Sequence, residues 1–260
     1  MKKAKPNYPI KVLDKSLSVL ELLLQKGSSM NMIELSEKLG FYPSTTHRIL
    51  DTLKHRGYVE QNSHTQKYQL GLKALELGMA KLHQMDLVRE ATPCLKELVN
   101  QCNETVHLGV LEEGEVLYLA KEESSQTIRM ISYVGKRAPL HCTALGKVLL
   151  AYLSEEERKK ILGEKVLPRF TENTITNRRE LEKELSKVKK QGFALDREEN
   201  EKNVRCIAAP IRNHQGKVIA ALSISSPIFR IDKNAQNNLK EALLEISKKI
   251  SKRLGYNGKW

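Results

Sequence analysis

The sequence predicts an α+β protein of two domains, the first mostly helical and the second a mixture of strands and helices. Before Asn103, apolar residues recur mainly at helical spacing. After Asn103, segments with strand character follow one another, separated by short polar turns and by further helical segments. Strands in this order favour an antiparallel sheet on which helices pack.

The chain is long enough for two hydrophobic cores and carries a large positive charge. Its 260 residues exceed the length of a typical single domain. The formal net charge of +13 favours a polyanionic partner. Residues 1–70 hold 11 Lys and Arg against 6 Asp and Glu, so this part is the more basic per residue. The charge is consistent with nucleic-acid binding but does not establish it.

Two helices are expected before residue 40. The first covers Val12–Gln25 and ends at Gly27, and the second covers MNMIELSEKLG. The first helix places four leucines on one face, which we expect to be buried: Leu13, Leu17, Leu20 and Leu24. In the second helix we expect the buried residues to be Met32, Leu35 and Leu39.

A third helix begins at Pro43, whose missing N–H suits the first helical position. We expect its apolar residues to be buried and four polar residues to be more exposed: Thr45, Thr46, Arg48 and Thr52. Two short strands follow, at Tyr58–Val59 and Tyr68–Leu70, around a polar loop. This order of elements is typical of a winged helix-turn-helix.

The winged helix-turn-helix predicts DNA binding through the start of its third helix. In such domains the N-terminal end of the second helix of the motif meets bases and phosphates in the major groove. The candidate DNA contacts are Ser44, Thr45, Thr46, His47 and Arg48, with Lys67 of the wing expected to contact phosphate. The alternative is a winged helix that binds another protein and never touches DNA.

The expected domain boundaries follow from these patterns. The DNA-binding domain is expected to cover residues 8–70 and a linker helix residues 71–85, with a break near Gln84 to Asp86. The linker helix is apolar on more than one side, as expected of a helix that packs against two neighbours. The second domain is expected to cover residues 86–256. The N-terminal stretch MKKAKPNYPIK, residues 1–11, is expected to form a mobile basic arm.

The second domain is expected to begin with a helix over Val88–Cys102. A strand pair around an EEGE turn and a third strand, TIRMISYV, should come next. Ser154 and Glu157 form a capping-box pattern at a helix start. Three more strands and two more helices complete the domain, at GFALD, VRCIAAPIRN, KVIAALSISSP, Asn177–Gln191 and Asp232–Leu254.

Three polar clusters in the second domain are candidates for a ligand site. Thr143 stands where a helix starts, so the backbone amides of Ala144 and Leu145 are expected to be free to bind an anion. Asp196 opens a polar cluster that leaves a strand, while Ser223 and Ser225 alternate onto one strand face, which Cys206 could join from the neighbouring strand. The alternative for the serines is a pair of hydrogen-bonded hydroxyls with no ligand.

Other chemistry has little support in the sequence. The four cysteines lie far apart and form no closely spaced ligand pair, so no metal site is expected. We expect no cofactor, because the phosphate-loop and dinucleotide fingerprints are missing. A catalytic alternative would use Cys142 or Cys206 as nucleophile and His141 as base. We expect no catalytic residues, and a cytoplasmic protein without a membrane span.

Several of these segments together resemble the IclR family of bacterial transcriptional regulators. The matching stretches are SSMNMIELSEKLGFYPSTTHRIL, APLHCTALGKVLLA, VRCIAAPI and AALSISSP, in the order found in the family. The resemblance covers essentially the whole chain. It implies a winged helix-turn-helix, a linker helix used in dimerisation and a GAF-like effector-binding domain. It also implies homodimers or tetramers on palindromic operator DNA, commonly acting as repressors.

The resemblance also implies an effector pocket. Carried over residue by residue, it would use the amides of Ala144 and Leu145 together with Asp196, Cys206, Ser223 and Ser225. Members of the family bind small carboxylates and 2-keto acids there. Within the family, the chain looks most like repressors of pectin and uronate catabolism that respond to 2-keto-3-deoxygluconate. The stretches ETVHLGVLEEGEVLYLAK and NTITN carry that similarity.

Two positions depart from the family pattern. Asn203 stands where the family commonly has Gly, and we expect it to adopt the left-handed conformation that Asn tolerates. The third helix opens PSTTHR instead of a Lys-Ser-Thr type start, which leaves the base contacts open. The effector, the operator, the choice between repression and activation, and the choice between dimer and tetramer are likewise not fixed by these residues.

Overall fold

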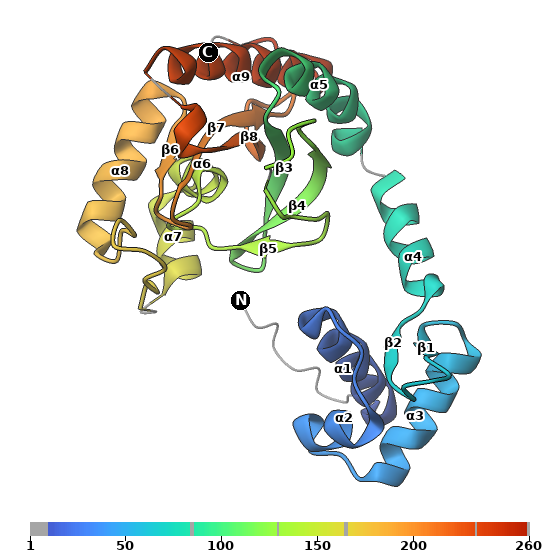
Figure 1. Ribbon diagram of the computed structural model, residues 1–260. Coiled ribbons are helices and arrows are strands. Elements are labelled where there is room, and N and C mark those ends of the chain that lie inside the picture. The colour runs from blue at the N-terminus through green and yellow to red at the C-terminus, as the bar shows by residue number, and fades with distance from the viewer. Residues whose placement is uncertain (1–9, 84–85, 129, 164–165, 232, 259–260) are drawn as a thin grey trace. The chain divides into compact units, whose positions relative to one another are not determined.

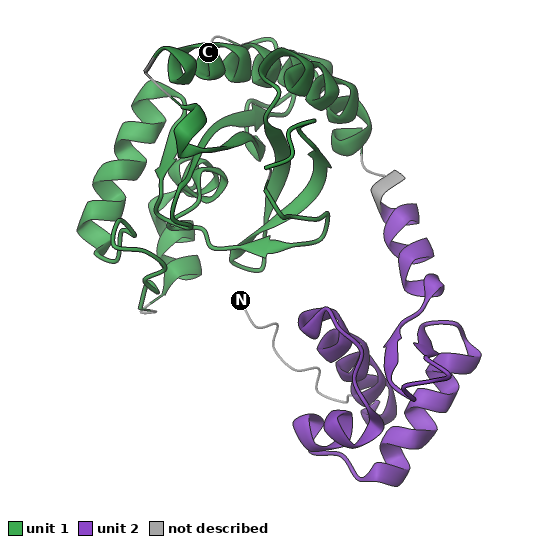
Figure 2. Cartoon of the chain, in the orientation of Figure 1, with its two compact units in different colours: residues 1, 85–260 green, residues 2–84 purple. Residues whose placement is uncertain are grey.

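The computed structural model describes residues 10–83, 86–128, 130–163, 166–231 and 233–258 (Figure 1). The chain divides into two compact units, residues 2–84 and 85–260 (Figure 2). Residues 1–9 of the predicted basic arm, and Gln84 and Met85 of the predicted break, lie outside the described residues, whereas Lys11 and Asp86 each begin a helix.

The N-terminal unit has the order of elements that the sequence predicts. Its helices are α1 (Lys11–Lys26), α2 (Met32–Leu39), α3 (Pro43–His55) and α4 (Leu72–His83). Its two strands are β1 (Val59–Gln61) and β2 (Tyr68–Leu70), which pair antiparallel. Asn31 caps α2 through a reciprocal capping box with Glu34, and Gly40 ends α2 in the left-handed conformation. The turn into α3 is therefore specified by local chemistry.

The core of this unit is built from a different face of α1 than the sequence suggested. Val19 and Leu23 are the buried residues of α1. The expectation that Leu13, Leu17 and Leu24 are buried is wrong, since each is at least 49% exposed. Leu20 is only partly buried. The cause is that α1 is apolar on two sides, and only packing against α2, α3 and β2 decides which side faces inward.

The C-terminal unit contains one antiparallel sheet with helices on both faces, so the α+β prediction is confirmed. Its strands are β3 (Thr105–Glu112), β4 (Glu115–Glu122), β5 (Arg137–Ala138), β6 (Ala194–Arg197), β7 (Val204–Arg212) and β8 (Val218–Pro227). They lie in the order β5-β4-β3-β8-β7-β6. The helices are α5 (Asp86–Cys102), α6 (Ala144–Ala151), α7 (Glu155–Leu162), α8 (Arg178–Gln191) and α9 (Lys233–Arg253), with a short 3-10 helix at Ile228–Arg230.

The helices divide between the two faces of this sheet. Helices α5 and α9 pack on one face, and α6 packs on the other with α8 beside it (Figure 1). Successive side chains of a strand point to opposite faces, so each strand contributes one row of residues to each side. Side chains on the face toward α6 therefore have different neighbours from those on the face toward α9, although both come from the same strands.

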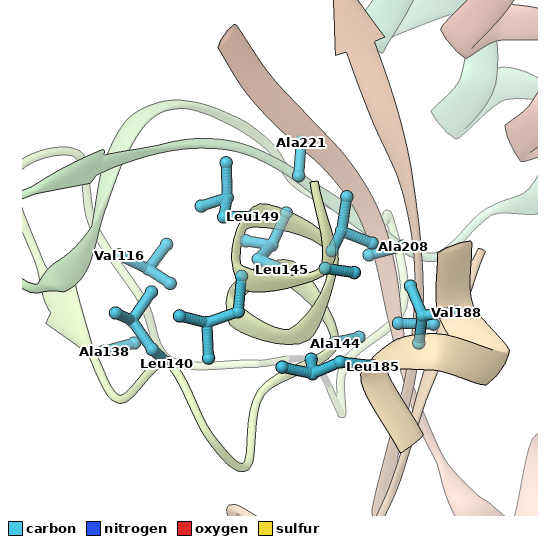
Figure 3. Packing of buried hydrophobic residues seen from close by; sticks show 14 of the residues in the cluster. Val116, Ala138, Leu140, Ala144, Leu145, Leu149, Leu185, Val188, Ala208 and Ala221 are labelled. Carbon is cyan, nitrogen blue, oxygen red and sulfur yellow. The ribbon is translucent and has the colours of Figure 1, made fainter. Parts of the chain in front are cut away.

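Helix α6 is completely buried and forms the centre of the larger core. Core residues labelled in Figure 3 come from α6, the sheet and α8: Leu145, Leu149, Val116, Ala208, Ala221, Leu185 and Val188. At Gly146 an added Cβ would lie 2.3 Å from the carbonyl oxygen of Leu140. Only glycine permits this approach. The close contact between Gly146 and Leu140 holds the start of α6 against the segment that precedes the helix.

The predicted strand at residues 127–134 is not a strand in the described part of that segment. Charged side chains take up its carbonyl groups instead. Lys121 Nζ donates to Met130 O and Ser132 O, at 3.3 and 2.7 Å, and Arg230 donates to Ile128 O. Carbonyls bonded to side chains cannot join a ladder, so the edge strand is β5. We call residues 123–135 the covering segment.

Other local predictions are confirmed. Ser154 and Glu157 form the expected capping box at the start of α7. Asn203 has φ 63°, the left-handed conformation expected there. The strands predicted at GFALD, VRCIAAPIRN and KVIAALSISSP correspond to β6, β7 and β8. Helix α5 begins earlier than expected, at Asp86, so Pro93 lies inside the helix and not near its start.

Candidate functional site

Helix α3 presents one continuous polar face to solvent. The exposed residues on it follow helical spacing: Ser44, His47, Arg48, Asp51 and His55. Within the described residues, the guanidinium of Arg48 has no hydrogen-bond or ion-pair partner, so all of its donors are available. Of the predicted DNA contacts on α3, Ser44, His47 and Arg48 are exposed and Thr45 is half-buried.

Thr46 is a correction to the predicted DNA contacts. Its side chain is 0% exposed, and its hydroxyl donates to Tyr42 O at 3.4 Å. Position 46 precedes Ile49 and Leu50 by three and four residues, so it lies on the buried stripe of α3. A side chain in that position packs inside the domain and cannot reach a base.

The wing has an ordered tip. The side-chain oxygen of Asn62 accepts hydrogen bonds from the backbone N–H groups of His64 and Thr65, at 3.0 and 2.9 Å. Such a turn fixes the loop without help from other elements. Lys67 is half-buried beside β2, and within the described residues its ammonium group makes no ion pair.

Sequence reasoning missed two residues of this face. Tyr42 precedes α3 and is 80% exposed, and Asp51 shares the polar face with Arg48. Helical spacing counted from Arg48 would have found Asp51. No pattern in the sequence identifies Tyr42, because its exposure depends on how α2 and α3 pack.

In the C-terminal unit, the structure brings all six predicted effector residues to one pocket on the α6 face of the sheet. They come from α6 and from three neighbouring strands: Ala144, Leu145, Asp196, Cys206, Ser223 and Ser225. Strand pairing explains the convergence. Asp196 is opposite Cys206, and Cys206 is opposite Ser225, so the three form a cross-strand row.

The start of α6 offers unpaired donors to this pocket. Thr143 caps the helix by accepting from Gly146 N at 3.1 Å. Among the described residues, the N–H groups of Ala144 and Leu145 have no acceptor. Free amides at a helix start, together with the positive end of the helix dipole, favour an anion.

The pocket is also lined by polar residues that sequence reasoning did not select. His107 lies opposite Ser223 in the register of β3 and β8. Its Nε2 is 2.7 Å from Ser132 Oγ, and its ring packs on Tyr118 with centroids 4.9 Å apart. Burial and the nearby charges of Lys121 and Lys136 lower the pKa of His107 to about 3, so its imidazole is neutral.

Ser132 and Lys136 reach the pocket from the covering segment and the residue that follows it. Together with His107 they add hydrogen-bonding groups to the pocket. The alternation of β3 would have pointed to His107, but nothing in the sequence places the covering segment over the pocket.

Asp196 is the acidic member of the pocket. It is 3% exposed, and its Oδ1 accepts from Glu199 N at 2.7 Å. Burial, with a contribution from the charge of Glu199, raises the pKa of Asp196 to about 7. A carboxyl group with this pKa is partly protonated near neutral pH, which lowers its repulsion of a bound anion.

The pocket is small in this structure. Its cavity volume is about 50 Å³, which holds little more than water. Met130 and Ile131 of the covering segment are among the residues that line it. A larger ligand therefore requires this segment to move outward.

The catalytic alternative is not supported by the geometry. Burial raises the pKa of Cys142 to about 12 and also raises the pKa of Cys206, so both thiols are protonated. His141 Nε2 lies 2.9 Å from Pro168 O, and Cys142 Sγ contacts Asn200. A thiol nucleophile needs an adjacent base, which neither cysteine has among the described residues.

Neither a metal-binding cluster nor a membrane-spanning helix is found in the described part of the chain. It holds no group of three or more His, Cys, Asp or Glu arranged to bind a metal ion. None of its helices combines the length and the apolar character needed to cross a bilayer.

Comparison with known proteins covers both units. One family model, described as the IclR helix-turn-helix domain, matches residues 12–63. A second, described as the C-terminal domain of the bacterial transcriptional regulator IclR, matches residues 79–252. The two matches together span most of the chain.

Individual relatives agree with these family matches. The HTH-type transcriptional regulator KdgR of Escherichia coli is 40% identical over 243 residues, 93% of this chain and 92% of that protein. XynR of the same organism, also an HTH-type transcriptional regulator, is 37% identical over 247 residues, 95% of this chain and 98% of that protein. A solved IclR homologue from Microbacterium hydrocarbonoxydans, complexed with 4-hydroxybenzoate, has TM-score 0.79 and 27% identity and covers 92% of this chain and 98% of that one. These proteins are regulators and not enzymes.

The raised pKa of Asp196 predicts a pH-dependent stability. Between the unfolded value near 4 and the folded value of about 7, the folded state holds a proton that the unfolded state has lost, so stability falls as pH rises through this window. Asp196→Asn mimics the neutral form. We expect it to match the parent near pH 3, where Asp196 is protonated in both states of the parent, and to exceed it by roughly 4 kcal/mol at pH 8, in urea unfolding followed by circular dichroism.

The control is Asp86→Asn, because Asp86 is an exposed carboxylate in α5. It should leave the pH dependence of the free energy of unfolding unchanged. Equal pH dependence in the parent and in Asp196→Asn would show that Asp196 is ionised throughout.

Proposed function

This chain belongs to the IclR family of bacterial transcriptional regulators, and we propose that it represses transcription by binding a palindromic operator until a small carboxylate occupies its C-terminal pocket. It is a DNA-binding regulator with an effector-binding C-terminal domain. The observation that carries the proposal is the convergence of α6 amides and polar strand residues on one pocket. We also propose the division into residues 8–70, 71–85 and 86–256 as DNA-binding domain, linker helix and effector domain.

We assign DNA contact to the exposed face of α3. Ser44, His47 and Arg48 lie at the start of this face, where the second helix of a helix-turn-helix meets the major groove. Thr45 is assigned a phosphate contact beside them, and Lys67 a phosphate contact from the wing. Thr46 is left out because it is buried. Asp51 shares the face, and a carboxylate there favours the amino group of cytosine.

We assign the effector's carboxylate to the N–H groups of Ala144 and Leu145. Unpaired amides at a helix start are the natural anion site of this pocket. Asp196, Cys206, Ser223 and Ser225 would bind the rest of the molecule through hydrogen bonds, with His107 and Lys136 on the opposite side. The 4-hydroxybenzoate bound by the homologue is also a carboxylate, which supports this class of ligand.

For the particular effector we propose 2-keto-3-deoxygluconate. A hydroxylated 2-keto acid would use both the anion-binding amides and the many hydroxyl and imidazole groups around them. The cavity of about 50 Å³ is too small for it, so binding requires the covering segment to open and close again. Near the pocket, this segment is bonded through its carbonyls to Lys121 and Arg230, and a ligand could rearrange these bonds, while Ser124 and Ser125 bind Asn103 at its other end. The ligand would drive this movement if it binds one state of the covering segment, open or closed, more tightly than the other.

We propose that the protein works as a homodimer or as a tetramer of such dimers. Helix α4 leaves Leu72, Leu75 and Met79 exposed at helical spacing, with Leu77 on another side. An exposed stripe of this kind is typical of a helix that pairs with a second copy. A two-fold symmetric pair of DNA-binding domains would match a palindromic operator.

Replacing Arg48 tests the DNA assignment. Arg48→Ala should weaken binding to the operator, mapped by footprinting upstream of neighbouring genes, by about 1–3 kcal/mol. The matched control is Lys26→Ala, which removes an exposed cation at the end of α1. Both variants should keep the parent's circular dichroism spectrum. Parent-like operator affinity of Arg48→Ala would refute the assignment.

Calorimetric titration tests the effector assignment. 2-Keto-3-deoxygluconate should bind the parent and release it from the operator. Ser223→Ala/Ser225→Ala should bind it about tenfold more weakly, because two buried hydroxyl partners are lost. Ser186→Ala, an exposed serine of α8, is the control. If pyruvate or 4-hydroxybenzoate binds and the sugar acid does not, 2-keto-3-deoxygluconate is refuted as the effector, while the proposal of a carboxylate effector stands.

Sedimentation velocity tests the proposed assembly. Leu75→Glu places a charge in the exposed stripe of α4 and should shift the protein to monomers at concentrations where the parent is dimeric. Lys81→Glu, on another side of the same helix, should leave the assembly unchanged. A dimer of unaltered affinity in Leu75→Glu would show that α4 is not the dimer contact.

A further inference from the structure

A second cavity lies on the other face of the sheet, beneath the start of α9. It has a volume of about 220 Å³ and is bordered by β6, β7, β8 and the first turns of α9. The effector pocket is lined by the side chains of Asp196, Cys206 and Ser225, which point toward α6. Strand alternation sends the side chains next to these toward α9. The sheet therefore lies between the two cavities, and Asp196 and Cys206 of its strands border both.

The inner part of this cavity is apolar. Leu195 is opposite Ile207, and Ile207 is opposite Ile224, so the three form one cross-strand row on the α9 face. Ile231 and Leu239 close the cavity from the side of α9. An engineered cavity of about 150 Å³ with similar lining is large enough for benzene. The volume here is thus sufficient for an apolar group of that size or larger.

The next row along the strands carries two arginines. Arg197 of β6 is directly opposite Arg205 of β7, and both residues line the cavity. Like charges directly opposite each other destabilise a sheet unless an anion lies between them. Their side chains are 47% and 37% exposed, and both residues also line a neighbouring surface hollow, which they share with Glu184, Glu198 and Glu199.

These arginines are poorly partnered. Arg197 approaches Glu184 at 3.7 Å, and Arg205 approaches Glu198 at 3.9 Å, which are longer than hydrogen bonds. In the described part of the chain neither guanidinium donates a hydrogen bond, and Arg205 Nε is buried without an acceptor. A buried donor without a partner is costly, so a ligand oxygen placed here would be favoured.

We propose that this cavity is a second ligand site, which binds a carboxylate with an apolar tail. The carboxylate lies between Arg197 and Arg205, where forked donors match its two oxygens. The tail lies along Leu195, Ile207 and Ile224 under α9. This assignment is independent of the effector proposed for the α6 face, because no side chain of the inner apolar row lines that pocket.

The site also bears on regulation, because its walls are the same strands that carry the effector residues. Asp196 lies between Leu195 and Arg197, and Cys206 lies between Arg205 and Ile207. A ligand that fixes one face of β6 and β7 limits the freedom of the residues on the other. By linkage, any effect on effector affinity is reciprocal.

Octanoate and 1-octanol are the probes for this site, since they share a chain length and differ in charge. Each is titrated into the full-length protein with its isoleucine methyl groups labelled for NMR. Octanoate should bind saturably and shift the methyl signals of Ile207, Ile224 and Ile231. Octanol should bind about tenfold more weakly, because it lacks the charge that the arginines recognise.

The decisive variant is Arg197→Gln/Arg205→Gln. It should bind octanoate about tenfold more weakly and bind octanol as the parent does. Arg89→Gln, an exposed arginine of α5, is the matched control and should behave like the parent. The double variant should melt no lower than the parent, because it removes a like-charge pair.

Three affinity results would overturn the proposal. They are a lack of saturable octanoate binding, equal affinity for octanoate and octanol, and undiminished octanoate binding by a folded double variant. Octanoate shifts confined to methyl groups that line the effector pocket, such as Ile131, would also overturn it, since they would place the probe on the α6 face.

Discussion

The ion pair between Lys147 and Glu199 is the contact on which the effector domain's geometry depends. Lys147 is 0% exposed in the middle of α6, and its Nζ lies 2.5 Å from Glu199 Oε1 and 3.6 Å from Glu184. A buried charge is tolerated only when it is paired, so the position of α6 and that of the segment after β6 are set together. Strand β6, which that segment follows, carries Asp196, while the start of α6 carries the free amides. This pair therefore joins the two halves of the pocket.

The same segment is fixed a second time through its backbone. The hydroxyls of Thr171 and Thr174 donate to the carbonyls of Glu198 and Glu199, each at 2.6 Å. Glu199 N in turn donates to Asp196, whose side chain is thereby directed into the pocket. These bonds fix the walls made by α6 and the strands, whereas near the pocket the covering segment is bonded through its carbonyls to Lys121 and Arg230. The movement proposed for the covering segment would rearrange only these last bonds.

A single sheet with different chemistry on its two faces explains how one domain can hold two ligand sites. On the α6 face the cross-strand row is Asp196, Cys206 and Ser225, and on the α9 face the neighbouring rows are apolar or cationic. The two faces keep their own side chains, because a shift of one residue in strand register would move every side chain of that strand to the opposite face. Register, set by the pairing of β6, β7 and β8, is thus what separates the sites.

The sequence by itself determined the features that depend on neighbours along the chain. Caps such as Asn31 and Ser154, the left-handed Asn203 and the alternation of Ser223 and Ser225 all follow from local chemistry, and so does the order of elements. Only the tertiary structure decided which side of an apolar helix is buried, and hence that Leu13 is exposed. Thr46 was predictable from the spacing of its own helix. The alternation of β3 points to His107, but its place beside Ser223 depends on pairing between strands that are more than 100 residues apart, with energies that no local pattern contains.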